Sequence, residues 1–212
     1  NEILAFFPQA KVINMVRDQR DVLLSQKNKW KRRFLGASRI PLSETIRSYI
    51  NYHPILTSKV WNASLEHSTK YFGNERVKIV KFEELLAKPE SVVKDVCSFL
   101  AIGFHPKMLN VHVVGSSTEQ DNKDDFLIDS SKIGKWKKGG LNSAEIYLSQ
   151  FISRKMMSEF SYHLEKFQLP PLLSLFYIIT FPVKLGLAFL LNIKRMGNMV
   201  EVINKRFFNN EG

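Results

Sequence analysis

The pattern of apolar and polar positions near the start of the chain indicates a strand followed by a helix. Residues 11–16 (KVINMV) form a short, nearly continuous apolar run, which is typical of a strand buried on both faces of a parallel sheet. The polarity changes at Arg17, and residues 22–24 with their polar neighbours predict a helix capped by Asp18. Arg17 is therefore expected at the carboxyl end of a parallel strand, where ligands bind in open α/β sheets.

The next elements repeat this alternation. Residues 44–72 carry a long helical pattern, which Pro54 should kink or split in two and which Ser43 is expected to cap. Residues 76–82 (RVKIVKF) first alternate and then become continuously apolar, which predicts a second buried strand. Helices alternating with buried strands in this way predict a parallel sheet with helices on its faces.

The second half of the chain reads as mostly helical. Residues 89–100 predict an amphipathic helix that begins at a proline, and residues 142–167 predict another, with Asn142 or Ser143 as its cap. Between these two helices, residues 111–131 are the loosest part of the chain. They are interpreted as a solvated loop.

Residues 169–193 are strongly apolar but contain Pro182 and Lys184 near their centre. The segment is about long enough to cross a bilayer, which takes roughly twenty residues. A charge and a proline at the centre disfavour a single span, so two short helices meeting near residues 182–186 are expected. They would either pack on the domain or make a membrane contact through residues 169–206, where the basic residues suit anionic headgroups.

Composition and charge narrow the classes of partner. The chain has 212 residues, 44% of them hydrophobic and 24% charged, which suits a globular domain with a sizeable core. Its net charge is +11, and residues 10–39 hold nine basic residues against two acidic ones. That concentration predicts a polyanionic ligand or an acidic surface. Cys97 is the single cysteine, so no intrachain disulfide can form, and a cytoplasmic or peripheral membrane location is favoured.

Arg17 and Ser25 are the first candidate binding residues. They lie eight positions apart, about two helical turns, so that a guanidinium at the strand end and a hydroxyl on the helix can converge on one anion. The alternative is a surface ion pair of Arg17 with Asp18 or Asp21, and a solvated Ser25. For an isolated pair at this spacing, the alternative is the commoner arrangement.

The string AKVINMVRDQRDVLLS, residues 10–25, resembles the 3′-phosphate-binding segment of the sulfotransferases that use 3′-phosphoadenosine 5′-phosphosulfate (PAPS). In that family a buried strand ends in an R-D-P-R-D-V-x-x-S type sequence, and this chain has Gln19 where proline is common. The resemblance implies that Arg17 and Ser25 hold the 3′-phosphate of PAPS. Three charged residues between them would shape the strand-to-helix turn: Asp18, Arg20 and Asp21.

A second string, SKIGKWKK at residues 131–138, resembles the family's carboxy-terminal cofactor segment. The resemblance implies that Lys132 and Gly134 touch the 3′-phosphate, that Trp136 buttresses the loop, and that Lys137 adds positive charge. The alternative is a Trp136 that anchors the core beside solvated lysines.

Two further segments are also interpreted with the family in view. Glu83 follows the second strand and is expected to be a carboxylate at a helix start rather than an acid or base. Basic residues 26–39, with interleaved Trp30 and Phe34, can indicate nucleic-acid binding. They stand where the family carries its acceptor-facing loop, so no nucleic-acid partner is expected.

The resemblance covers residues 2–167. It implies a three-layer α/β fold of the P-loop NTPase-like sulfotransferase type, with a parallel sheet flanked by helices, incomplete at its amino terminus. Residues 168–212 would form an apolar and basic helical tail. The 5′-phosphosulfate loop and the catalytic base would both precede Arg17, and residues 1–11 contain no such loop, so no catalytic residue is assigned.

These features predict an enzyme that moves a sulfuryl group from PAPS to a hydroxyl or amine of a glycan, lipid or small molecule, without a metal. The 212 residues alone are expected to be inactive. The alternative is a non-enzymatic, basic, membrane-peripheral domain that binds anions. The net charge and the apolar tail support it.

Overall fold

Two parallel strands lie at the centre of the molecule. The structure, a computed structural model, describes residues 2–113, 117, 119, 120, 122–126 and 128–195. Strand β1 (Val12–Val16) pairs with β2 (Val77–Lys81) in register, from Val12 opposite Val77 to Val16 opposite Lys81. The predicted α/β class and its parallel sheet are confirmed.

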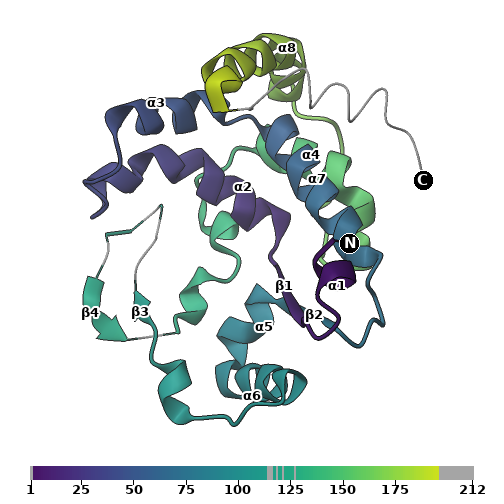
Figure 1. Cartoon of the computed structure of the whole chain (residues 1–212). Helices are drawn as coiled ribbons and strands as arrows, with labels where there is room; N and C mark the ends of the chain where they lie inside the picture. The colour runs from purple at the N-terminus through teal and green to yellow at the C-terminus, as the bar shows by residue number, and fades with distance from the viewer. Residues whose placement is uncertain (1, 114–116, 118, 121, 127, 196–212) are drawn as a thin grey trace.

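Helices account for most of the remaining described chain (Figure 1). In chain order the α-helices are α1 (Glu2–Phe6), α2 (Gln19–Asn28), α3 (Leu42–Asn51), α4 (Pro54–Thr69), α5 (Phe82–Ala87), α6 (Pro89–Leu100), α7 (Ser143–Glu159) and α8 (Leu173–Asn192). The 3₁₀ helices are η1 (Lys29–Phe34), η2 (Pro106–Leu109), η3 (Ser130–Lys132), η4 (Lys135–Lys138) and η5 (Ile193–Arg195). The segment predicted to be a loop contains an antiparallel pair instead, β3 (His112–Val113) with β4 (Asn122–Phe126).

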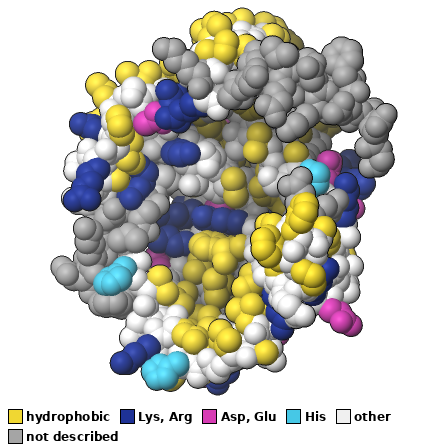
Figure 2. Space-filling view, viewed as in Figure 1, with side chains coloured by type: hydrophobic (Ala, Val, Ile, Leu, Met, Phe, Trp, Pro, Cys, Tyr) yellow, Lys and Arg dark blue, Asp and Glu magenta, His cyan; other side chains and the backbone are white. Residues whose placement is uncertain are grey.

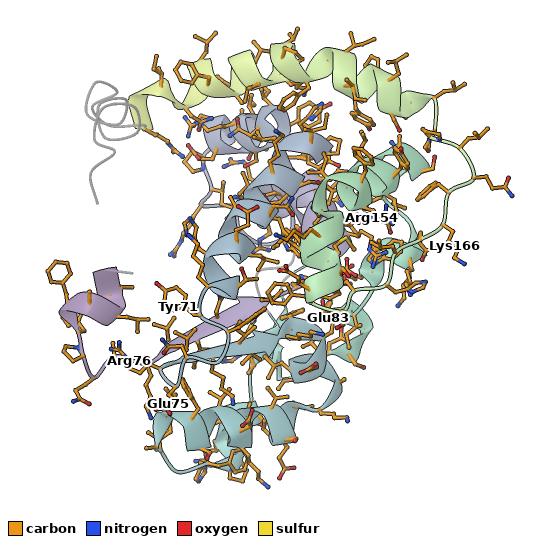
Figure 3. All side chains as sticks on the ribbon, turned by 90° about the vertical axis from the view of Figure 1, so that its right-hand side faces the viewer. Tyr71, Glu75, Arg76, Glu83, Arg154 and Lys166 are labelled. Carbon is orange, nitrogen blue, oxygen red and sulfur yellow. The ribbon has the colours of Figure 1, made fainter. Side chains whose placement is uncertain are left out.

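The main core lies between the sheet and helices α4 and α7. Its buried members are Val16, Trp61, Leu65, Met156, Met157 and Phe160. Figure 3 shows α6 on the other side of the two strands, so that the sheet has helices on both faces. This arrangement places the carboxyl end of β1 directly beside the start of α2.

One prediction for β1 is wrong: the strand is not buried on both faces. Side chains alternate across a strand, and Val16 points into the core while Ile13 is 40% exposed and Met15 is 50% exposed. The reason is packing, because α5 and α6 contact β2, and β1 pairs with β2 alone within the described chain.

Pro54 separates two helices, as the sequence predicted. It occupies the first turn of α4, where a backbone N–H would have no acceptor within the helix, so a proline costs no intrahelical hydrogen bond. The preceding helix α3 begins at Leu42 with Pro41 at its N-cap position, and no side chain caps it. The expectation that Ser43 caps this helix is therefore wrong.

Helix α7 begins as predicted and ends early. Asn142 accepts a hydrogen bond from the Glu145 amide, and the Glu145 carboxylate accepts one from the Asn142 amide, which completes a capping box. The helix ends at Glu159, short of the predicted end. Ser161 adopts a left-handed conformation (φ 57°) that turns the chain and brings Tyr162 against the core.

Helix α8 is continuous through Pro182, so the prediction of two short helices is wrong. A proline removes one backbone hydrogen bond and usually kinks a helix. Residues on both sides of it are fixed to the body of the protein, among them Tyr177, whose hydroxyl accepts a bond from Asn142, and Asn192, whose amide donates to Asn51. These contacts anchor the helix to the domain on both sides of Pro182.

Candidate functional site

Arg17 lies at the carboxyl end of β1, as predicted. Its carbonyl oxygen accepts a hydrogen bond of 3.1 Å from the Trp61 indole, which fixes the end of the strand. Its guanidinium lies 4.6 Å from the centre of the Phe82 ring, and Nη2 donates to the Lys132 carbonyl at 3.3 Å. The buried Nε has no hydrogen-bond partner among the described residues. The side chain as a whole is 27% exposed, so an anion can reach the guanidinium.

Ser25 lies on α2, whereas Arg17 stands between the end of β1 and the Asp18 cap of that helix. Asp21 and Ser25 are four positions apart and therefore neighbours on one face of α2. The Arg17 Nη2 atom lies 3.9 Å from Asp21 Oδ2, an ion pair without a hydrogen bond. The Ser25 hydroxyl lies 3.2 Å from that of Ser117. The alternative ion pair with Asp21 is thus present in weak form.

Asp18 and Arg20 form a buried structural unit. Asp18 caps α2 as predicted, because its carboxylate accepts from the Arg20 amide at 2.8 Å. The Arg20 guanidinium donates to both oxygens of the Asp18 carboxylate, at 3.0 and 2.7 Å, and to the Gln150 side chain at 2.8 Å. It also lies 4.0 Å from the Trp136 ring centre. Arg20 therefore stabilises the turn and holds Trp136 in place.

Asp21 has a role that sequence analysis missed. Its carboxylate accepts two backbone hydrogen bonds of 2.9 Å, one from Gly134 and one from Trp136. The side chain is almost fully buried, and burial raises the pKa of this carboxyl, although the Trp136 amide and Arg17 oppose the rise. Asp21 thus joins the two predicted cofactor segments and does more than shape its own turn. Its spacing of four positions from Arg17 was the only signal in the sequence.

Lys132 contacts Arg17 through its backbone carbonyl, and its ammonium group is paired with carboxylates. Its carbonyl accepts from Arg17, and its ammonium forms ion pairs with Glu119 and, at 3.5 Å, with Asp129. Burial lowers the pKa of Lys132, and the nearby charges of Lys135 and Arg17 lower it further. Glu119, which also pairs with Lys135, was not predicted.

The rest of this segment is ordered around Trp136. Gly134 has a left-handed backbone (φ 62°), which brings its amide to Asp21. Trp136 is buried, while Lys137 is exposed with its ammonium 5.6 Å from the Trp136 ring centre. The structure thus brings Gly134 and Trp136 to the α2 turn and leaves Lys137 at the surface.

Glu83 serves the scaffold. Its carboxylate accepts hydrogen bonds from the Asp18 amide at 2.8 Å and from the Tyr162 hydroxyl at 3.0 Å. Figure 3 shows Glu83 at the start of α5, close to α7. Burial, together with the Glu83 carboxylate, raises the pKa of Tyr162. These contacts agree with the interpretation of Glu83 as a structural carboxylate.

Gln19 occupies the place where the family commonly has proline. It is fully buried, and its amide donates to the Ser58 hydroxyl at 2.8 Å, which ties the start of α2 to α4.

Figure 2 shows that Lys and Arg side chains gather in a hollow in the middle of this face of the molecule. Within the described ranges, no group of three or more His, Cys, Asp or Glu side chains is placed to hold a metal.

Comparison with known proteins places the chain in a family. The family model described as "Sulfotransferase family" matches residues 1–106, half of the chain. A solved sulfotransferase domain from the Synechococcus PCC 7002 olefin synthase superposes with a TM-score of 0.51 and 24% identity, over 78% of this chain and 53% of that one. A sulfotransferase domain from the curacin biosynthetic pathway gives a TM-score of 0.48 and 23% identity, over 76% and 56%.

This chain spans about half the length of those two structures. No curated protein matches it. At these identities the olefin synthase domain supports the fold and nothing finer, whereas the family model rests on the sequence itself. The chain belongs to the sulfotransferase family.

Proposed function

We propose that this chain supplies the 3′-phosphate half of a PAPS site in a sulfotransferase. The observation that carries the proposal is the junction between the α2 turn and residues 132–136, which lie more than a hundred positions apart. Asp21 and Arg17 both bond to the backbone of that later segment. Two segments that each resemble a cofactor-binding string therefore lie in one place.

The side chains at this junction suit the 3′-phosphate group. Arg17 offers a partly exposed guanidinium just after β1, and Ser25 offers a neutral hydroxyl on α2. A planar cationic fork with an added hydroxyl matches phosphate geometry. Bound PAPS would bring an activated sulfuryl group, and these residues would hold and orient its nucleotide end.

Sulfuryl transfer needs two further parts, a loop around the 5′-phosphosulfate and a base for the acceptor. We assign neither to the 212 residues, because residues 1–11 hold no Gly, Ser, Thr and Lys loop and Glu83 is bonded into the scaffold. The isolated chain is expected to bind the nucleotide without transferring sulfate. The proposed acceptor is a hydroxyl or amine of a glycan, lipid or small molecule, and nucleic acid is not a proposed partner.

Calorimetric titration of adenosine 3′,5′-bisphosphate, alongside 5′-AMP, tests the proposal. The chain should prefer the bisphosphate, and Arg17→Ala should weaken its binding at least about tenfold, since a charged hydrogen bond is worth about 1.5–3 kcal/mol. The matched control is Lys70→Ala. It removes one positive charge just after α4, next to Tyr71, which lines a cavity with the first residues of β1 and β2, and it should leave binding unchanged.

Two results would overturn parts of this proposal. Equal affinity for the two nucleotides, unaffected by Arg17→Ala, would favour a non-enzymatic domain that binds anions without selecting the 3′-phosphate. Sulfation of any acceptor by the 212 residues alone, with PAPS as donor, would show that the chain holds the phosphosulfate loop and base in an unrecognised form.

A further inference from the structure

Helix α8 presents a wide apolar face that the rest of the described protein does not cover. The outward positions recur along the helix at intervals of three, four and one, so they form one continuous stripe. Among its exposed members are Leu175, Phe176, Ile179, Val183, Leu187 and Leu190. Contiguous apolar surface of this kind marks an interaction site.

The inner face of α8 is fixed to the domain. Tyr177 and Phe181 lie against the buried His53 ring, with ring centres 5.7 and 5.3 Å apart. Hydrogen bonds of 3.0 Å anchor the two ends, from Asn142 to Tyr177 and from Asn192 to the Asn51 side chain. The helix is thus held along its length, and its apolar face is directed outward.

The apolar surface continues onto α3, which packs against α8. Leu42, Ile46 and Tyr49 of α3 are all exposed. Figure 2 shows hydrophobic side chains over α8 at the top of the molecule, and Figure 3 shows α8 as an outer layer beyond α3 and α4. We call the exposed apolar residues of α8 and α3 the α8–α3 surface. Two helices lying side by side make it broad enough for a planar partner.

The charges around this surface are positive. No Asp or Glu occurs from Leu169 to Arg195, and the chain as a whole carries a net charge of +11. A cavity of about 420 Å³ lies where η1, α3 and α8 meet, and its lining combines aromatic rings with Lys27, Lys31 and Lys184. Glu145 also lines it and pairs with Lys27, which leaves Lys31 and Lys184 as the excess positive charge of the lining. Glu44 on α3 is already paired with Arg47 and Arg195. This rim complements an anionic bilayer surface.

We propose that the α8–α3 surface binds the surface of an anionic membrane, with α8 lying in the plane of the interface. An in-plane helix buries its apolar face about 5–10 Å into the bilayer and keeps its other face on the protein. Helix α8 fits this division, because one face is apolar and exposed and the other is hydrogen-bonded to the domain through Tyr177 and Asn192. The proposal does not depend on PAPS binding.

Two other arrangements fit the structure less well. A membrane-spanning α8 has the required length and a mean hydropathy of 1.9, but spanning would break the contacts with His53, Asn142 and Asn51 and bury Lys184 in hydrocarbon. A second copy of the chain pairing through the same surface would bring two positively charged rims together, since no Asp or Glu occurs from Leu169 to Arg195. Residues 196–206 of the predicted membrane contact lie outside the described residues.

Vesicle flotation of the whole chain tests the proposal, with vesicles of phosphatidylcholine alone or mixed with phosphatidylserine. We expect binding to the mixed vesicles that weakens as salt is raised. Ile179 is 66% exposed in the protein and lies in the apolar stripe that the bilayer would bury. Ile179→Asp should therefore reduce vesicle binding at least about tenfold, because it places a charge in contact with the acyl chains. The matched control is Ile102→Asp, 52% exposed and just beyond α6 at the opposite end of the molecule, which should bind as the parent does (Figure 1).

Both variants change exposed residues, and circular dichroism would confirm that each is folded. Absence of flotation with the mixed vesicles, or equal loss in both variants, would overturn the proposal. Extraction of bound protein by alkaline carbonate is expected, whereas protein that resists extraction would indicate a spanning helix. A dimer in light scattering that Ile179→Asp converts to a monomer, without vesicle binding by the parent, would assign the surface to a second copy.

Discussion

The Asp21 carboxylate accepts a hydrogen bond of 2.9 Å from the backbone amide of Trp136. This single contact joins the first helix after β1 to a segment 115 positions later in the chain. The second carboxylate oxygen bonds the Gly134 amide in the same way. The geometry of the candidate nucleotide site therefore depends on a buried acid that itself need not touch a ligand.

Replacing this acid should destabilise the protein. In Asp21→Ala, two backbone donors lose a charged acceptor in a buried place, and such a loss costs about 1.5–3 kcal/mol. Urea unfolding should show that decrease in the free energy of unfolding. Asp95→Ala serves as the control, because its carboxylate is 65% exposed and pairs only with Lys78 among the described residues. It should change stability by less than about 1 kcal/mol, and equal losses in both variants would contradict the prediction.

Glu83 should matter for stability and not for nucleotide affinity. Glu83→Ala removes the acceptor of the Asp18 amide and of the Tyr162 hydroxyl, so we expect a loss of about 1–3 kcal/mol. Tyr162→Phe, which removes one of the two bonds, should cost less. Affinity for adenosine 3′,5′-bisphosphate, measured by calorimetry on the folded variants, should stay within about twofold of the parent. A much larger loss of affinity would place Glu83 in the binding site.

Glu119 should oppose anion binding, because it neutralises Lys132 and Lys135 beside Arg17. Glu119→Gln removes one negative charge from beside these two ammonium groups, while Lys132 keeps its ion pair with Asp129, and partly exposed ion pairs are worth up to about 1 kcal/mol. We expect bisphosphate affinity to rise by about two- to fivefold at low salt, with a smaller gain at high salt. Weaker binding in the variant would show instead that Glu119 orders the segment around Gly134.

The stability of the protein should depend on pH through His53, whose ring packs against Tyr177 and Phe181 of α8. Burial lowers the pKa of His53 below its ordinary value of 6.5, and the charge of Lys184 adds to the shift, while the Tyr177 backbone opposes it. The unfolded chain therefore takes up a proton before the folded one does, so the free energy of unfolding falls as the pH drops below 6.5.

Unfolding at a series of pH values from about 7.5 to 5 measures this effect, with His53→Asn as the comparison. The variant has no imidazole to protonate, so its free energy of unfolding should fall less steeply over this range than that of the parent. Identical slopes in the two proteins would mean that His53 is not the group responsible.

The sequence by itself determined the elements whose signals are local. The apolar run before Arg17, the cap at Asp18, the proline between α3 and α4 and the cap at Asn142 all correspond to observed structure. Each depends on residues within one or two turns of one another, where periodicity and backbone capping decide the conformation. The family resemblance rested on two short strings, and the family model that agrees with it spans residues 1–106 and so covers the first of them, residues 10–25.

Only the tertiary structure decided the rest. The exposure of Met15 depends on which helices cover the sheet, the continuity of α8 depends on partners on both sides of Pro182, and the role of Asp21 depends on a segment far along the chain. A proline or a buried acid has no fixed outcome in isolation, because its hydrogen-bond partners come from other elements. Local patterns thus set where helices and strands form, and packing set which side chains meet.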